Sequence, residues 1–323
     1  TLGVERKIRA VTVNASYVAT ASVKLTAADQ PNAYTGATAE FARYTQFDAK
    51  GQVTGGFGPI FLVNNHAHSS YHAMQASASN QLTSWGLGVQ ASYSWSKSLD
   101  DVSGILGATP SQDPFHTRLE KGPSTFDVSH AMSFSLFQDL HADRAPLVGR
   151  LGKKVMGGWQ MLAIGSVNTG LPFTVLSGIQ QTGAGAGGAD RPDQIGTPPF
   201  STSRTIREDY FGLGDGNASY FQIPIGVTGG TGPNQGRFGA LGRNTFRGPM
   251  FHNFDVAFIK DTPLAVRNGR ERAALQFRGE FFNVFNVVNF GLPQNTLLGA
   301  GFGRIAKTAG SSRQIQFSMK VIF

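Results

Sequence analysis

The sequence predicts an all-β fold in which antiparallel strands cross a membrane as part of a barrel, and three observations carry the prediction. The chain ends on nine residues, Ile315 to Phe323, in which apolar and polar side chains alternate. That length matches the roughly 9 to 11 residues of a tilted strand that crosses a bilayer. Glycine (41 residues) and phenylalanine (25) are abundant and charged residues make up only 15%, which favours strands and irregular loops over amphipathic helices. No apolar run reaches about 18 residues, so a helical membrane span is excluded.

The C-terminal strand has one apolar face and ends on an aromatic residue. Ile315, Phe317, Met319, Val321 and Phe323 alternate with polar side chains, as in a strand with one face in lipid. Such an ending resembles the signal by which outer-membrane β-barrels are recognised for assembly. It predicts that the chain lies in the cell outer membrane, contacts membrane lipid and lipopolysaccharide there, and is inserted by the barrel assembly machinery.

The clearest internal strand runs from Trp85 to Ser96. Its odd-numbered residues up to Trp95 are apolar or aromatic and include Tyr93, whereas the other face carries glycine, glutamine and serine. About ten residues of tilted strand place the two indole rings roughly 23 Å apart along the membrane normal, near the height of an apolar band. A half-buried strand of a soluble sandwich would alternate in the same way. The rings at both ends favour the membrane, and we expect Trp85, Tyr93 and Trp95 to belong to its aromatic girdle.

Seven further segments alternate less clearly and complete a set of nine strands. They are Leu2–Ile8, Val11–Val18, Tyr71–Ser79, Val128–Leu136, Trp159–Val175, Phe254–Phe258 and Arg272–Asn283. Pro172 predicts a bend, a bulge or an exposed edge within the fifth of these segments. In the last segment the apolar residues point outward, so we expect Gln276, Arg278 and Glu280 to face the barrel lumen and to form a contact surface there.

The links between the strands alternate in length. Short links are predicted near 9–10, 80–84, 141–157 and 261–271, and long loops near 19–68, 97–127, 179–250 and 285–312. Short periplasmic turns and long extracellular loops are typical of outer-membrane barrels, which places Phe323 at the periplasmic end. A complete bacterial barrel has an even number of strands and begins in the periplasm, whereas this set of about 9–12 strands begins outside. Residues 1–323 are therefore expected to be one domain, the C-terminal portion of a larger barrel, incomplete at the N-terminus.

Several kinds of chemistry can be weighed against this fold. The chain has no cysteine, which excludes disulfides, thiolate catalysis and zinc–thiolate sites. The net charge is +8, but the basic residues are scattered and form no stripe, so nucleic acid is not an expected partner. The run Gly183–Gly188 matches a dinucleotide-binding pattern, but prolines follow it and no helix can start there. No nucleophile elbow is present either. We expect neither an enzyme nor a cofactor.

Three histidines provide the one candidate metal constellation. His66, His68 and His72 are evenly spaced, so an extended segment places all of them on one side. No nearby carboxylate completes the set, and solvated histidines in a polar loop are the alternative.

Carboxylates at Asp100, Asp101, Asp113 and Asp127 have oxygens that suit calcium, but their spacing matches no compact calcium loop.

A series of short segments, in this order, resembles the C-terminal barrel of TonB-dependent receptors. The resemblance is to the Oar-like group, which carries a carboxypeptidase-regulatory-like N-terminal domain. The segments are Ala91–Asp101, Gln112–Pro114, Gly122–His130, Gly157–Gln160, Thr169–Val175, Arg191–Asp193, Gly242–Pro249, Phe277–Asn286, Asn289–Pro293 and Phe302–Ile305. Each segment is weak alone, whereas the ordered series covers most of the chain.

The resemblance implies a 22-stranded barrel with a plug in its lumen. It also implies TonB-dependent uptake of a scarce ligand, in the class of metal chelates, oligosaccharides or peptides. The plug domain and TonB are then partners of the full-length protein, although the sequence shows no recognisable plug. A surface-exposed structural or adhesive β-protein without transport activity is the alternative.

Overall fold

A computed structural model describes eleven stretches of the chain. They are residues 1–32, 44–58, 60–80, 83–104, 111–141, 157–179, 190–197, 210–211, 220–224, 238–267 and 270–323, with only the backbone for 265–267 and 270–272. The predicted run Gly183–Gly188 lies outside them. No helix in the described residues is both long and apolar enough to span a membrane.

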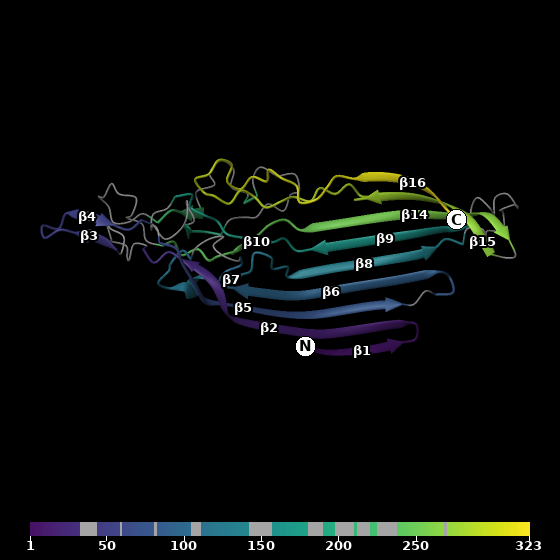
Figure 1. The fold of residues 1–323 in the computed structure, drawn as a ribbon, viewed down its shortest axis with the longest axis horizontal. Helices are drawn as coiled ribbons and strands as arrows, with labels where there is room; N and C mark the ends of the chain where they lie inside the picture. Colours follow the sequence, from purple (N-terminus) through teal and green to yellow (C-terminus); the bar gives the residue numbers. More distant parts are fainter. Residues whose placement is uncertain are drawn as a thin grey trace.

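Nine long strands form one sheet, in the order in which they occur along the chain (Figure 1). They are β1 (Leu2–Ile8), β2 (Val11–Asp29), β5 (Leu62–Asn80), β6 (Leu87–Asp100), β8 (His130–Asp139), β9 (Trp159–Asn168), β14 (Phe251–Arg267), β15 (Arg270–Phe282) and β16 (Gln314–Ile322). Every neighbouring pair is antiparallel. The predicted all-β antiparallel fold is therefore confirmed.

The sheet is open in the described residues, with β1 and β16 as its two edges. These strands are first and ninth in an antiparallel series, so they run in the same direction. They therefore cannot close the sheet by pairing antiparallel with each other. Backbone groups along such edges need partners in lipid, because no water is there to satisfy them.

Several strand ends differ from the sequence prediction. Strand β2 continues to Asp29 and β5 begins at Leu62, because the two segments pair through a bulged register well beyond their alternating parts. Trp85 lies in the turn before β6 rather than in the strand. The predicted link at 261–271 is strand almost throughout, since β14 and β15 pair up to Arg267 and Arg270.

The predicted strand Trp159–Val175 stops at Asn168. Its continuation leaves the sheet, and β10 (Pro172–Phe173) pairs instead with β13 (Phe246–Arg247). This break coincides with Gly170 and Pro172, and Gly170 lies so close to the backbone of Gly248 that a side chain would not fit there. The bend predicted at the proline is present.

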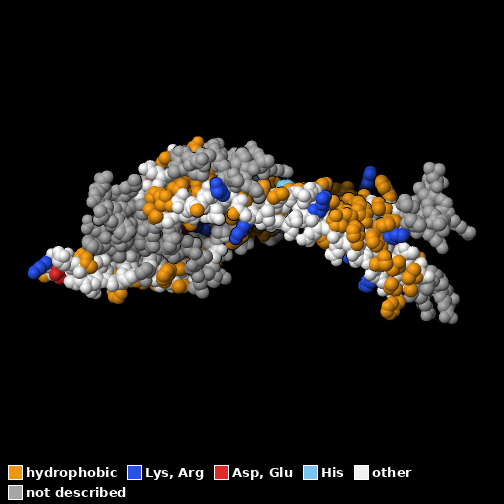
Figure 2. All heavy atoms as spheres, turned by 90° about the horizontal axis from the view of Figure 1, so that it is seen from above, with side chains coloured by type: hydrophobic (Ala, Val, Ile, Leu, Met, Phe, Trp, Pro, Cys, Tyr) orange, Lys and Arg blue, Asp and Glu red, His pale blue; other side chains and the backbone are white. Residues whose placement is uncertain are grey.

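Alternation gives the sheet an apolar and a polar face. Residues that pair across neighbouring antiparallel strands point to the same side, so Phe277 shares a face with Met319, and Arg278 shares the other face with Ser318. Figure 2 shows hydrophobic side chains gathered over the strands towards the short-turn end of the molecule. Leu2, Trp95 and Phe317 are exposed large hydrophobic residues of the apolar face, at 75%, 58% and 64% exposure.

The described segments between the long strands gather in a loop layer at the other end of the sheet (Figure 1). Short strands stabilise this loop layer: β7 (Gly122–Pro123) on the end of β6, the pair β11 (Asp193–Gln194) and β12 (Phe221–Gln222), and the hairpin of β3 (Thr45–Phe47) and β4 (Val53–Gly56). One 3₁₀ turn, η1 (Thr117–Glu120), precedes β7. A buried apolar cluster of the described residues lies here and not between sheets. It consists of Phe173, Val175, Phe211, Phe221, Leu241, Phe246 and Phe302.

Candidate functional site

A cavity of about 350 Å³ lies within the loop layer. Its wall combines residues from widely separated parts of the chain, which the aromatic cluster and the short strand pairs bring together. The lining residues are Asp101, Val102, Ser103, Gly104, Ser111, Gln112, Glu120, Thr125, Pro172, Phe173, Thr174, Leu176, Arg191, Arg243, Asn244, Leu292 and Asn295. We call this space the loop cavity. Its volume is within the range of small-molecule sites, about 300–1,000 Å³.

A buried ion pair forms one side of the loop cavity. Arg191 donates from Nη1 to Oε2 of Glu120 at 2.7 Å and from Nη2 to Oε1 at 3.0 Å. Both side chains are only 6% exposed. Gln112 extends the contact, since its backbone N–H donates to Glu120 and its side-chain oxygen accepts the N–H of Arg191 at 2.9 Å. The Nε of Arg191 is buried and has no hydrogen-bond partner among the described residues.

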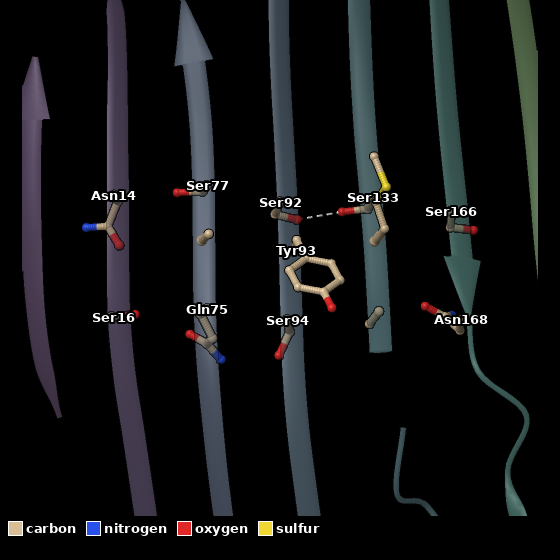
Figure 3. A pocket seen from close by; sticks show the side chains of 13 residues that line it. Asn14, Ser16, Gln75, Ser77, Ser92, Tyr93, Ser94, Ser133, Ser166 and Asn168 are labelled. Atoms are coloured by element: carbon tan, nitrogen blue, oxygen red, sulfur yellow. Dashed lines mark hydrogen bonds between the residues drawn. The ribbon is translucent and has the colours of Figure 1, made fainter. Parts of the chain in front are cut away.

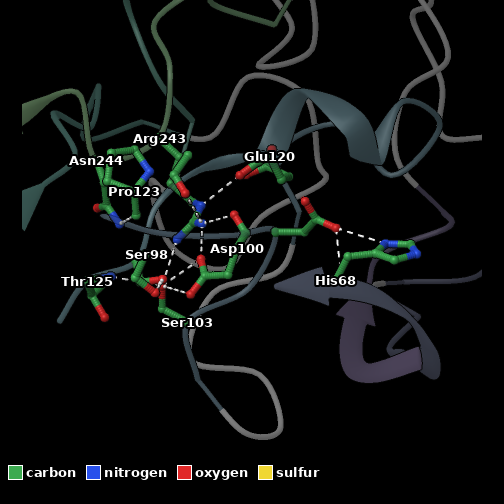
Figure 4. Close-up of polar contacts among 12 residues, drawn as sticks. His68, Ser98, Asp100, Ser103, Glu120, Pro123, Thr125, Arg243 and Asn244 are labelled. Carbon is green, nitrogen blue, oxygen red and sulfur yellow. Dashed lines mark hydrogen bonds and ion pairs between the residues drawn. The ribbon is translucent and has the colours of Figure 1, made fainter. Parts of the chain in front are cut away.

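A second arginine binds the end of strand β6 to the same wall (Figure 4). Arg243 donates from Nε to the backbone oxygen of Glu120 at 2.8 Å and from Nη1 to Oγ of Ser103 at 2.9 Å. Its Nη2 contacts the carboxylate of Asp100, which also accepts the hydroxyl of Ser103 at 2.8 and 2.9 Å. Asp100 is 2% exposed, so its charge is balanced by a partner rather than by water.

Two other acidic residues between β6 and β8, Asp113 and Asp127, also have hydrogen-bond or ion-pair partners. Asp127 contacts Arg247 and accepts the backbone N–H of Ser98. Asp113 accepts from His116 at 2.8 Å. These carboxylates therefore serve as anchors between loops and the end of β6, and they do not converge on a common point for calcium.

The polar face of the sheet carries a groove of about 490 Å³ (Figure 3). Its polar lining consists of hydroxyl and amide side chains: Asn14, Ser16, Gln75, Ser77, Ser92, Ser94, Ser133, Ser166 and Asn168. Ser92 and Ser133 are hydrogen-bonded across β6 and β8 at 2.7 Å. Ser94 and Asp100 lie on the same face of β6, six residues or about 20 Å apart. One strand face thus leads from the groove to a carboxylate that holds a wall of the loop cavity.

The three candidate histidines each have a different partner. His66 contacts Asp29 at 2.8 Å, His68 contacts Asp101 at 3.2 Å, and His72 accepts or donates to the hydroxyl of Tyr17 at 2.6 Å. In the described part of the chain, no group of three or more histidine, aspartate or glutamate side chains is placed to hold a metal ion. The pairing of Asp29 with His66 and of Asp101 with His68 could not be predicted, because the partners are distant in sequence.

The remaining predicted residues lie as follows. Trp85, Tyr93 and Trp95 are exposed, and the Tyr93 hydroxyl is hydrogen-bonded to His130 at 2.8 Å. Gln276, Arg278 and Glu280 share the polar face of β15, with Gln276 donating to Asp261 and Arg278 within 3.3 Å of Glu280. The C-terminal residues Ile315, Phe317, Met319, Val321 and Phe323 are all exposed. Their expected roles in girdle, lumen and assembly remain predictions.

Comparison with known proteins gives one family and a distant structural likeness. Residues 1–316 match the family model described as "Outer membrane beta barrel domain". Among solved structures, the chain is similar to the outer membrane transporter YddB from Escherichia coli, with 10% identity and a TM-score of 0.47. That alignment covers 99% of this chain and 31% of the transporter, so the chain spans about a third of its length. No curated protein matches the sequence.

Proposed function

This chain belongs to the outer membrane β-barrel domain family, and from that premise we propose that it acts in a TonB-dependent receptor of the Oar-like group. Membership of the family also places it in the cell outer membrane. The proposed activity is the uptake of a scarce ligand, by binding and transport rather than by catalysis. The ordered motifs from Ala91–Asp101 to Phe302–Ile305 support the assignment to this group.

One observation supports a receptor most strongly: the loop layer contains a cavity whose walls are fixed by buried ion pairs. Holding Glu120 and Arg191 out of water is costly unless their geometry is good, and the contact between them uses both carboxylate oxygens. Loops fixed in this way are preorganised for a ligand. The polar face of β6 then offers a hydrophilic surface from the loop end towards the short turns.

The opposite face suits the surroundings that an outer-membrane protein requires. Exposed apolar residues such as Trp95 and Phe317 would contact membrane lipid and lipopolysaccharide. The terminal Phe323 would be read by the barrel assembly machinery. A plug domain would lie against the polar face, and TonB would act through that plug.

A specific feature favours an adhesive surface protein as the second candidate. The hairpin of β3 and β4 projects at the far end of the loop layer (Figure 1). Phe47, Val53 and Phe57 in or beside it are 48%, 51% and 64% exposed. Exposed apolar residues at a loop tip are typical of contact with another surface.

Transport and adhesion are distinguished by an energy requirement. Cells that express the natural full-length protein would be compared with otherwise identical cells that lack TonB. Accumulation of ligand should depend on the protein, on TonB and on the proton gradient, and removing the β3–β4 hairpin should not abolish it. Uptake that is equal in both strains would exclude the proposed function, and loss of cell attachment on removing the hairpin would favour adhesion.

A further inference from the structure

We propose that the apolar face of the sheet has, at its loop end, a discrete binding site for a lipid phosphate, filled by the lipid A part of lipopolysaccharide. The inference rests on the proposed contact of this face with membrane lipid, and it gives that contact a place and a recognition chemistry. Three observations on the described residues support it: a hollow in the apolar face, a change from apolar to basic side chains along the strands, and one unpaired cation.

A hollow of about 430 Å³ lies at the loop end of the apolar face, over β2, β5 and β6. We call this space the lipid hollow. Tyr17, Met74 and Trp95 line it, and they form one row because Tyr17 is paired with Met74 and Met74 with Trp95 across the three strands. All three side chains are exposed. Large apolar and aromatic side chains at this height of a membrane protein contact the upper part of lipid acyl chains.

The next row of residues towards the loop layer is basic. His72 and Lys97 are paired across β5 and β6, and both line the lipid hollow. Each lies two residues beyond the apolar row on its own strand, or about 7 Å closer to the loops. Tyr17 joins the two rows, since its hydroxyl is hydrogen-bonded to Nδ1 of His72 at 2.6 Å. An apolar row followed by a basic row matches the order of acyl chain and phosphate in a membrane lipid.

The charges of the lipid hollow leave one accessible cation unpaired. Its charged lining residues are Lys97, Asp127 and Arg247. Arg247 is bound to the carboxylate of Asp127, so these two charges balance each other. Lys97 is exposed and has no hydrogen-bond or ion-pair partner among the described residues. The next carboxylate along the chain, Asp101, is paired with His68. A phosphate in the hollow would therefore meet an uncompensated positive charge.

The place of the hollow in the sheet favours a lipid over a free anion. Its apolar row continues into the apolar face, so that side of the hollow meets hydrocarbon once the protein is in the outer membrane. A small anion would lose its hydration there, whereas the phosphate of a lipid already lies at the boundary and its acyl chains cover the apolar row. Long loops are extracellular in such barrels, which places the hollow in the outer leaflet, where the phosphorylated lipid is lipopolysaccharide.

Mass spectrometry of the lipid that stays bound to the full-length protein, purified from outer membranes in detergent, tests the inference. We expect lipid A to be retained in a fixed ratio to the protein. Lys97→Gln removes the unpaired charge at an exposed position and should lower the retained lipid A about fivefold, whereas Lys97→Arg should keep it. Lys260→Gln is the matched control. Lys260 also lies on the apolar face beside an aromatic ring, that of Trp159, but at the short-turn end.

Titration of the delipidated protein with lipid A, with dephosphorylated lipid A and with inorganic phosphate separates the sources of the phosphate. Lipid A should bind at least about fivefold more tightly than its dephosphorylated form, and millimolar inorganic phosphate should not displace it. Equal binding of the two lipids, displacement by inorganic phosphate, or retention of a phospholipid in place of lipid A would overturn the inference. An equal loss of lipid A in Lys97→Gln and Lys260→Gln would overturn it too, because any lysine at a membrane boundary would then act alike.

The lipid site and the receptor function can fail separately. Heat-modifiable gel mobility checks that Lys97→Gln still folds, and uptake in cells with and without TonB is measured on the same variant. Loss of lipid A with TonB-dependent uptake retained supports the site and keeps the receptor. Lipid A bound through Lys97 in a protein whose uptake does not depend on TonB would reject the proposed function and leave the site standing.

Discussion

Arg191 and Glu120 form a contact with two hydrogen bonds, 2.7 and 3.0 Å long, although 71 residues separate them in sequence. The pair joins η1 to the start of β11, and Arg243 then joins the same turn to the end of β6. The loop layer is thereby fastened to a strand of the sheet through buried charges. The order of the loop layer depends on these ion pairs more than on strand pairing, since β11, β12 and β13 have only two residues each.

The first prediction concerns this buried pair. Arg191→Gln leaves the Glu120 carboxylate buried without its partner, which typically costs about 3–5 kcal/mol. The loops should then open locally, so limited proteolysis between residues 101 and 250 should become faster by an order of magnitude or more. Heat-modifiable gel mobility, which reports on the strands, should be unchanged. The double variant Glu120→Gln with Arg191→Gln should recover part of the protection, and a double variant no better than the single one would show that the pair is not what orders the loops.

The second prediction concerns pH. Burial raises the pKa of Tyr210 to about 12, and its hydroxyl donates to the backbone oxygen of Arg247. Because the folded pKa lies above the unfolded value of about 10, the contribution of Tyr210 to stability is fully present below pH 10 and is lost as pH rises to 12. The loop layer should therefore become protease-sensitive within that range. Tyr210→Phe should remove this part of the pH dependence, and a spectroscopic titration of tyrosinate should show one group fewer at the alkaline end.

The long strands were predictable because their pattern is local. Alternation of apolar and polar residues within a segment such as Trp85–Ser96 reports directly on two strand faces, whatever the rest of the chain does. Strand ends were less predictable. The last residues of β2, Ala27 to Asp29, are all buried and do not alternate, so nothing local marks them as strand. The strand that begins at Trp159 was expected to end too late for a different reason: its continuation leaves the sheet and pairs with a distant segment, Phe246–Arg247.

The loop cavity was not predictable, since its geometry depends on contacts between distant segments. Arg243 and Asp100 are 143 residues apart, and no spacing rule connects them. One signal was available: Arg191 stands between Asp190 and Pro192 in a stretch rich in glycine and proline, where a buried charge is unexpected. Which carboxylate it would meet could not be read from the sequence, because many acidic residues lie in the same long loops.

The third prediction concerns packing on the apolar face. Gly165 on β9 lies between the rings of Phe134 and Phe254, and an added Cβ would come within 2.9 Å of Phe254 and closer still to Phe134. Gly165→Ala should therefore destabilise the folded sheet by about 1–3 kcal/mol, measured by urea unfolding in detergent. Gly279→Ala on β15 is the matched control, because its nearest contact is the Phe317 ring at 3.2 Å and that ring can shift. A larger loss at Gly279 would contradict the packing argument.

The fourth prediction separates assembly from stability at the C-terminus. Phe323 is fully exposed beyond the end of β16, so its side chain contributes little to the folded state. Phe323→Ala should leave the urea unfolding midpoint within the range of an ordinary surface change, about 0.5 kcal/mol, but should lower the heat-modifiable fraction in outer membranes several-fold. Ile322→Ala changes a neighbouring residue on the opposite face of the same strand and should affect membrane assembly less. If both variants assemble normally, Phe323 is not the residue that the assembly machinery reads. If Phe323→Ala lowers stability and assembly together, its effect is structural, and the terminal residue has contacts in the assembled barrel that the nine-stranded sheet lacks.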